Sequence, residues 1–449
     1  MNMGQKRLGY KLTHIFFILS LLTASFDILL NLEIDGASYR FALVMQIIFI
    51  FSAVFAGGVS KNSSGSPYIQ PLAFGYLVIW GMFLVLWTPR TYHLSFSVGY
   101  TGWFLICVAV VFAAVQYYGH DRKQALQISR IYINVYVFVA AFGLLQFVLG
   151  ILGVELLVTQ WWIAGRLPRL NGFSYEPSYY ATYLVTGWGM LAWLTERRVY
   201  LYSKNYTHMA FVIVSAALVL SSSRMGILIV FGYFAYYILK NILFIIFNAR
   251  VDARFLKLMA VCAGLSALAV GGVLATTGFK SLTFLLFGTG LGGTADHSAS
   301  IRWGQFQDTI EMFLASPIMG YGLGGLWSYL ATKQGLPLDE VTGMNVTAEV
   351  LASTGILGFP FFILFIGTLI LGSFRFIKNR TLESELLAAA GIGFILLFVI
   401  LQFNQSIIRV YLWNHIAIMA VLYHYVRQPT IRRPAPPHRH SPPQHDVYA

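Results

Sequence analysis

The chain has 449 residues, of which 57% are hydrophobic and only 10% charged, and its mean hydropathy is +0.69. Soluble domains carry about 25% charged residues, so this composition excludes an ordinary soluble enzyme. The net charge of +13 does not indicate nucleic acid as a partner, because the basic residues separate apolar stretches instead of forming a basic surface with interleaved aromatic residues.

The apolar residues fall in stretches of roughly 17 to 25, the length that crosses a bilayer core about 30 Å thick as a helix. This pattern predicts an all-α polytopic membrane protein with about twelve transmembrane helices. The expected helices lie near residues 14–32, 41–57, 68–87, 97–118, 128–151, 178–195, 207–221, 225–247, 256–275, 350–374, 385–404 and 410–426.

The distribution of basic residues orients these helices, because Lys and Arg accumulate in cytoplasmic loops. Most Lys and Arg residues fall on the cytoplasmic side when both termini are placed in the cytoplasm. The first apolar stretch is then expected to be a transmembrane helix and not a cleaved signal peptide. The basic residues left on the outer side are mostly arginines, whose guanidinium groups suit bidentate phosphate or carboxylate recognition. Pairing with outer carboxylates and binding of an anionic ligand both explain them. They are Arg40, Arg90, Arg166, Arg169, Arg224, Lys280, Arg302, Lys333 and Arg409.

Two long outer segments, 151–177 and 276–349, interrupt a chain whose other loops are short. Structural loops rarely reach such lengths, so function is expected in these segments. Within the second, residues 301–318 predict an amphipathic helix that either lies in the interfacial plane or packs on other helices. We expect one integral membrane domain over 1–426. The proline-rich, His- and Arg-containing segment 427–449 is expected to be a disordered cytoplasmic tail.

Two glycine motifs, Gly288 to Gly293 and Gly320 to Gly325, have the spacing G-x-G-x-x-G. Neither has the preceding strand or the downstream acidic residue of a dinucleotide site, so no nucleotide cofactor is expected. The glycines predict either a close approach of main-chain N–H groups to an anion or a mobile loop.

Charged residues near the membrane are functional candidates because burial there is costly. Arg224 follows three serines between two expected helices, and Asp27 is expected late in the first helix. For Arg224, snorkelling to the interface is the alternative. The serines lack the G-x-S-x-G frame and the base of a hydrolase, and no zinc or metal-nucleotide motif is present, so no metal site is predicted.

Three stretches together resemble the O-antigen polymerase and ligase superfamily, that is, Wzy-type polymerases and WaaL-type ligases. Their order and spacing agree with the predicted topology. They are Arg169-Leu-Asn-Gly-Phe-Ser-Tyr-Glu176-Pro-Ser178; Ser221-Ser-Ser-Arg224-Met-Gly226; and Arg302-Trp303 with Pro317-Ile-Met-Gly-Tyr-Gly-Leu-Gly-Gly325 and Asn345-Val-Thr-Ala-Glu349-Val-Leu-Ala-Ser-Thr-Gly355-Ile-Leu-Gly358.

The resemblance implies a GT-C-type membrane glycosyltransferase that needs no metal. It implies glycans linked to undecaprenyl pyrophosphate as substrates at the periplasmic face of the bacterial inner membrane, and a partner that regulates chain length. Arg169 and Arg302 match family arginines thought to hold the pyrophosphate, and Arg224 matches the Ser-Arg motif.

One departure separates polymerase from ligase. Ligases typically carry a His-Asn pair in which the histidine is proposed to activate the acceptor, whereas this chain has Met344 before Asn345. We therefore favour polymerisation, in which a growing glycan moves from its lipid pyrophosphate to a lipid-linked repeat unit. Glu176, Glu349 and His297 are the candidate bases. A ligase that transfers glycan to lipid A-core, and a transporter or flippase of lipid-linked or anionic substrates, remain as alternatives.

Overall fold

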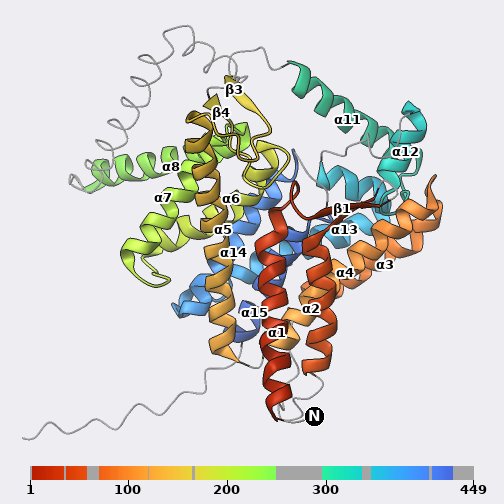
Figure 1. Cartoon of the computed structure of the whole chain (residues 1–449). Coiled ribbons are helices and arrows are strands. Elements are labelled where there is room, and N and C mark those ends of the chain that lie inside the picture. The colour runs from red at the N-terminus through yellow and green to blue at the C-terminus, as the bar shows by residue number, and fades with distance from the viewer. Residues whose placement is uncertain are drawn as a thin grey trace, which may run out of the picture.

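The computed structural model describes residues 3–34, 37–57, 70–119, 121–163, 167–248, 296–335, 345–403 and 407–427. Helices dominate this part of the chain, and the only strands in it form two short antiparallel hairpins, β1–β2 and β3–β4 (Figure 1). The α-helices are α1 (Met3–Leu22), α2 (Phe41–Gly57), α3 (Pro71–Trp87), α4 (Leu94–Tyr118), α5 (Arg122–Ile151), α6 (Pro177–Arg197), α7 (Lys204–Leu220), α8 (Arg224–Asn248), α11 (Asp296–Ala315), α12 (Gly325–Gln334), α13 (Val346–Phe374), α14 (Leu382–Ile400) and α15 (Val410–Arg427). The strands are β1 (Asn31–Ile34), β2 (Ala37–Arg40), β3 (Trp161–Ile163) and β4 (Leu167–Pro168).

Among the described residues, six helical stretches are long and apolar enough to cross a membrane, and three shorter apolar helices accompany them. The protein is therefore an all-α polytopic membrane protein, as the composition predicts. The six stretches are Pro71–Arg90, Leu94–Tyr118, Arg122–Ile151, Arg224–Phe247, Val346–Asn379 and Leu382–Ile400. The helix expected near 256–275 and the tail 428–449 lie outside the described residues.

The helices pack in pairs that are distant in sequence: α6 lies against α14, α3 against α13, and α4 against α15. Aromatic side chains fill these contacts. Trp80 of α3 and Trp413 of α15 are fully buried, and both pack edge-on against the ring of Phe104 of α4, at centroid distances of 5.2 and 5.4 Å. Such rings supply large buried areas with a preferred mutual geometry, which stabilises the packing of these helices.

The first helix ends earlier than its apolar pattern predicts. It stops at Leu22, and after a 3-10 turn the chain leaves the helical path, so Asp27 lies beyond the helix and not within it. The N–H groups of Asp27 and Ile28 both donate to the carbonyl oxygen of Phe173, at 2.9 and 3.0 Å. These tertiary contacts satisfy backbone groups that a longer helix would have satisfied internally.

Helix α13 is interrupted at Gly355, whose φ of 60° and ψ of −169° lie in a region that only glycine adopts readily. The loop that begins at Pro317 fills the gap. Tyr321 and Gly322 donate their N–H groups to the carbonyls of Ala352 and Ser353, while the N–H groups of Ile356 and Leu357 donate to Pro317 and Ile318. These four hydrogen bonds pair backbone groups at the break, as an apolar environment requires.

This arrangement also decides what the second glycine motif does. Gly320, Gly322 and Gly324 all have positive φ, and a Cβ on Gly320 would lie 2.5 Å from the carbonyl oxygen of Ala352. The glycines therefore allow the loop to lie directly on α13. The N–H groups of Tyr321 and Gly322 are taken up by the helix and are therefore not available to an anion. The first glycine motif, Gly288 to Gly293, lies outside the described residues.

The helix predicted over 301–318 is present as α11, from Asp296 to Ala315. Its buried face, formed by Thr309 and Met312, packs toward α13, whereas Trp303 and Leu314 are more than 60% exposed. Figure 1 shows α11 and α12 on the side of the bundle that carries α3 and α4, away from α7 and α8. Lys333 of α12 pairs with Asp308 and Glu311 of α11, which joins the two helices.

The break in α13 yields a stability prediction. Substitution Gly355→Ala forces a side chain into a glycine-only conformation and places its Cβ 2.3 Å from the carbonyl oxygen of Ile318. We expect a loss of about 2 kcal/mol or more in unfolding free energy, measured as a lower Tm of the purified protein. Gly367→Ala is the matched control, since a Cβ at Gly367 meets no atom within 4 Å. Equal melting temperatures for the two variants would contradict the interpretation.

Candidate functional site

The segment from Arg169 to Glu176 is held in place by one buried amide. The Oε1 atom of Gln146, in α5, accepts the N–H groups of Asn171 and Gly172, at 3.3 and 3.0 Å, and its Nε2 atom donates to Leu156 O at 2.9 Å. The side-chain amide of Asn171 donates to Leu157 and Ser174. Because the backbone of this segment is bonded on several sides, the charged residues at its two ends have fixed positions.

Gly172 and Phe173 also fix the position of this segment. Gly172 has a φ of 55°, and a Cβ there would lie 2.5 Å from the ring of Tyr180, so no larger residue fits without displacement. The ring of Phe173 stacks between Phe26 and Phe142, with centroids 4.1 and 4.0 Å away. The end of α1 is thereby joined to the segment that precedes α6.

Arg169 is anchored to the turn between α7 and α8. Its Nε atom donates to Ser222 Oγ at 2.8 Å, and its Nη1 atom donates to Gln160 Oε1 at 2.7 Å. Burial lowers the pKa of Arg169, with a further lowering from the neighbouring charge of Arg224 that Glu176 opposes. Arg224 begins α8, as predicted, and its side chain is exposed with no hydrogen bond or ion pair among the described residues.

Glu176 occupies the N-cap position of α6, but its carboxylate makes no capping hydrogen bond with the backbone N–H groups of the helix. The carboxylate is half-buried and accepts the hydroxyl of Ser178 at 2.8 Å. It acts electrostatically on Arg169 and on Tyr179 without forming an ion pair within 4 Å among the described residues. Glu176 therefore lies between the Arg169 anchor and a second group of charges.

That second group is an ion cluster of Asp27, Arg40 and Arg409, which we call the arginine pair with its shared aspartate. The Oδ1 atom of Asp27 lies 2.7 Å from Nη1 of Arg40 and 3.7 Å from Nη1 of Arg409. Asp27 is 5% exposed, and the two arginines are 19% and 16% exposed. The guanidinium carbon of Arg409 lies 5.1 Å from the ring centre of Tyr179, in α6, a cation–π arrangement.

Glu349 lies beside this cluster, in the first turn of α13. Its side chain is 1% exposed, and neither carboxylate oxygen has a hydrogen-bonding partner within the described ranges. Arg409 and the backbone N–H of Ile407 act on it electrostatically without meeting hydrogen-bond geometry. An unpaired buried carboxylate is costly, so Glu349 is a candidate for the functional site.

The residues predicted from sequence are therefore only partly assembled. Arg169, Arg224 and Glu176 share one neighbourhood, and Glu349 belongs with Arg409 in the adjacent one. Arg302 and His297 lie on α11, but their side chains are outside what the structure describes. No group of three metal-binding side chains occurs among the described residues.

The sequence names no partner for Asp27. Arg40 and Arg409 belong to the outer arginines, for which pairing with carboxylates and binding of an anionic ligand were both expected, and the structure pairs them with Asp27. Asp27 and Arg40 lie near the N-terminus of the chain, whereas Arg409 lies near the C-terminus. The available clue was that arginine, not lysine, stands directly before the helices at 41 and 410.

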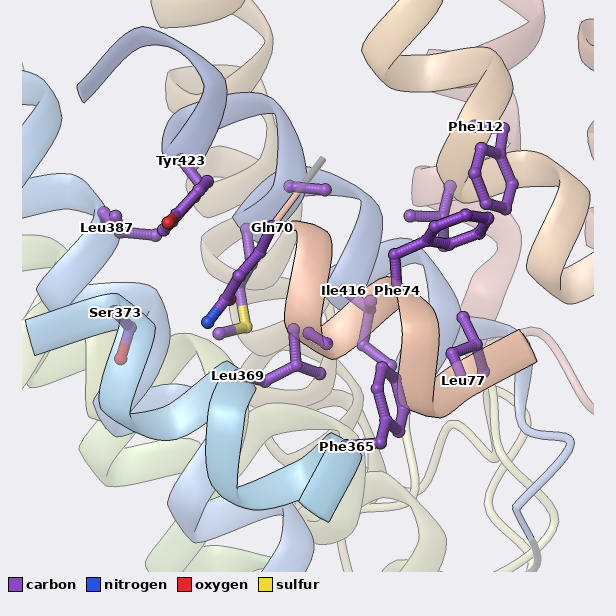
Figure 2. A pocket seen from close by; sticks show the side chains of 14 residues that line it. Gln70, Phe74, Leu77, Phe112, Phe365, Leu369, Ser373, Leu387, Ile416 and Tyr423 are labelled. Atoms are coloured by element: carbon purple, nitrogen blue, oxygen red, sulfur yellow. The ribbon is translucent and has the colours of Figure 1, made fainter. Parts of the chain in front are cut away.

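The structure also contains an apolar pocket of about 30 Å³ between α3, α4, α13, α14 and α15 (Figure 2). Phe74, Phe112, Phe365 and Leu369 point into it, and Gln70 at its edge donates to the carbonyl oxygen of Thr368 at 2.6 Å. None of the candidate site residues lines this pocket, so it takes no part in the chemistry considered below.

The role of Gln146 in positioning the Arg169–Glu176 segment can be tested by removing its side-chain amide. Gln146→Leu leaves the buried N–H groups of Asn171 and Gly172 without an acceptor, at a cost of about 1–3 kcal/mol for each unsatisfied group. We expect a lower Tm and faster proteolysis after residue 169 in the purified protein. Leu145→Ala, at a 50% exposed position on the same helix, is the control. A Gln146→Leu variant as stable as the control would show that Gln146 does not hold this segment in place.

Comparison with known proteins gives one match. Residues 209–363 match the model of the O-antigen ligase family, a range that contains Arg224, α11 and Glu349 but neither Arg169 nor the arginine pair with its shared aspartate. No curated protein matches the chain. This part of the chain is therefore similar to the O-antigen ligase family, which confirms the resemblance to the superfamily of O-antigen polymerases and ligases.

Proposed function

We propose that the protein is a polysaccharide polymerase of the bacterial inner membrane. It transfers a growing glycan from undecaprenyl pyrophosphate to a lipid-linked repeat unit at the periplasmic face. The observation that carries this proposal is Glu349, a fully buried carboxylate without hydrogen bonds beside a cluster of arginines. A glycosyl transfer from pyrophosphate needs both a base for the incoming hydroxyl and positive charge for the departing phosphate.

Glu349 is the base that we favour over Glu176 and His297. Its oxygens have free lone pairs, whereas one oxygen of Glu176 already accepts the hydroxyl of Ser178. In the proposed step, Glu349 takes the proton of the acceptor hydroxyl, whose oxygen bonds to the anomeric carbon. The bond from that carbon to the phosphate oxygen breaks, and the electron pair leaves with the pyrophosphate.

Arg169, Arg224 and Arg302 are proposed to bind the pyrophosphate. Arg169 is rigidly held by Ser222 and Gln160, so it is pre-organised, and Arg224 next to it has an exposed and unpaired guanidinium. Fixed guanidinium groups stabilise developing negative charge without reorganisation during the reaction. Because these side chains supply the charge, the proposed reaction requires no metal ion and no cofactor.

The same proposal includes the membrane arrangement. We place about twelve helices across the bilayer in a GT-C-type fold, with both termini in the cytoplasm, following the distribution of basic residues. Residues 1–426 then form the membrane domain, the segments 151–177 and 276–349 face the periplasm, and 427–449 form a cytoplasmic tail. A partner that regulates chain length would act on this periplasmic side.

A ligase is the second candidate, because the matching family model describes O-antigen ligases. A ligase would transfer the finished glycan to lipid A-core instead of extending a lipid-linked chain. Met344 occupies the position at which ligases carry the proposed histidine base. This residue favours polymerase, and the products that accumulate in cells distinguish the two activities.

The role of Glu349 predicts a defined loss of activity. Glu349→Gln keeps the size of the side chain but removes the base, so we expect polymer formation to fall by about 10²- to 10⁴-fold, with the protein still present in the membrane. The measurement is the rate of polymerisation of lipid-linked repeat units by the purified enzyme. Glu155→Gln, at an exposed position of the segment 151–177, serves as control. Full activity of Glu349→Gln would exclude Glu349 as the base.

Arg302 is tested in cells by a gel of surface glycan and lipid-linked glycan from a deletion strain. We expect the polymer ladder to return with the wild-type gene and not with Arg302→Ala, because a pyrophosphate contact is lost. Full-length polymer accumulating on the lipid carrier in the deletion strain would favour the ligase. Single units retained on the cytoplasmic side would favour a transporter or flippase. Complete rescue by Arg302→Ala would remove Arg302 from the site.

A further inference from the structure

We infer that Arg40 and Arg409, held by Asp27, form a phosphate-binding site in addition to Arg169, Arg224 and Arg302. The ligand class is a phosphate or pyrophosphate group, and within the proposed function it belongs to a lipid-linked glycan substrate. The identity of the substrate rests on the proposed function, and the inference adds a second phosphate-binding site to it.

The first argument is the count of donors against acceptors. A guanidinium group has five N–H donors, yet the carboxylate of Asp27 is the only ion-pairing partner of Arg40 and Arg409 among the described residues, and neither side chain donates another hydrogen bond there. Both side chains are more than 80% buried. The N–H groups that Asp27 does not engage are available to a ligand, and a phosphate offers several oxygens in the geometry that guanidinium groups favour.

The second argument is that the site is built rigidly. Asp27 is fixed through its N–H group by the carbonyl of Phe173, at 2.9 Å. Arg40 ends β2 and directly precedes α2, while Arg409 directly precedes α15 and lies on the ring of Tyr179. Three separate parts of the chain therefore hold two guanidinium groups against one carboxylate, a pre-organised arrangement that costs little to bind an anion.

The third argument is charge. Asp27 neutralises one of the two arginines, so the cluster of these three residues keeps one net positive charge. Arg409 lies near enough to Glu349 to act on it electrostatically but forms no ion pair with it. An anion bound at Arg40 and Arg409 would therefore be held in the neighbourhood of the buried carboxylate.

The cluster is distinct from the Arg169 anchor. Arg169 follows β4 and is bonded to Gln160, directly before β3, and to Ser222, in the turn before α8. Arg40 and Arg409, in contrast, directly precede α2 and α15. Tyr179 and Glu176 lie electrostatically between the two groups. Removing one group therefore leaves the contacts of the other intact.

The test measures binding directly with the full-length protein in nanodiscs. The probes are undecaprenyl phosphate incorporated into the disc and sodium pyrophosphate in solution, and the variant is the double substitution Arg40→Lys with Arg409→Lys. Lysine keeps the charge beside Asp27 but loses the planar fork. We expect the Kd for undecaprenyl phosphate to rise about tenfold or more, with an unchanged Tm. Arg375→Lys, an exposed arginine at the end of α13, is the matched control.

A second variant guards against misfolding. Arg409→Gln alone removes one guanidinium group and leaves the close ion pair of Asp27 with Arg40 in place, so no buried charge is left without a partner. It should weaken binding of undecaprenyl phosphate while the protein still unfolds cooperatively. Unchanged affinity in both folded variants would overturn the inference, and so would a wild-type protein that binds neither probe.

The two probes identify the source of the phosphate. Loss of affinity for the lipid probe supports a lipid-linked ligand, and a loss confined to sodium pyrophosphate supports a free anion and overturns the lipid assignment. Binding is measured without polymerisation. A wild-type protein that binds the lipid through Arg40 and Arg409 but makes no polymer would therefore refute the proposed function and leave the site standing.

Discussion

One carboxylate holds the candidate site together. Asp27 is the shared counter-ion of Arg40 and Arg409, and its backbone N–H group is bonded to Phe173 in the segment that carries Arg169 and Glu176. Each charge removed from water is costly unless it is paired, so Asp27 and the two arginines stabilise one another. The end of α1, the start of α2, the start of α15 and the approach to α6 are thereby fixed relative to one another.

The second constraint is the need to pair every backbone group in an apolar setting. It explains why the loop before α12 has glycines at positive φ and why α13 is broken at Gly355. A side chain at Gly320 or Gly355 would overlap the partner backbone. Sequence motifs that suggest a nucleotide-binding loop can therefore have a purely architectural origin in a membrane protein.

The positions of the helices could be predicted from sequence because long apolar stretches have few alternatives in a bilayer. The end of α1 and the break in α13 could not, since both depend on contacts with segments more than thirty residues away. For the site, Arg169, Arg224 and Glu176 could be selected from motifs, and the structure brings them into one neighbourhood. The pairing of Asp27 with Arg409 joins residues from the two ends of the chain, and no local pattern encodes such a contact.

The exchange of hydrogen bonds at Gly355 has a mechanical consequence. The loop and the break share four backbone hydrogen bonds, through Tyr321, Gly322, Ile356 and Leu357. The loop therefore bridges the break in α13 by hydrogen bonds, and α11 cannot shift alone without exposing unpaired backbone groups. Because Glu349 stands less than two turns before the break, any rearrangement of the long segment around α11 is transmitted as a tilt or rotation of the turn that carries this carboxylate.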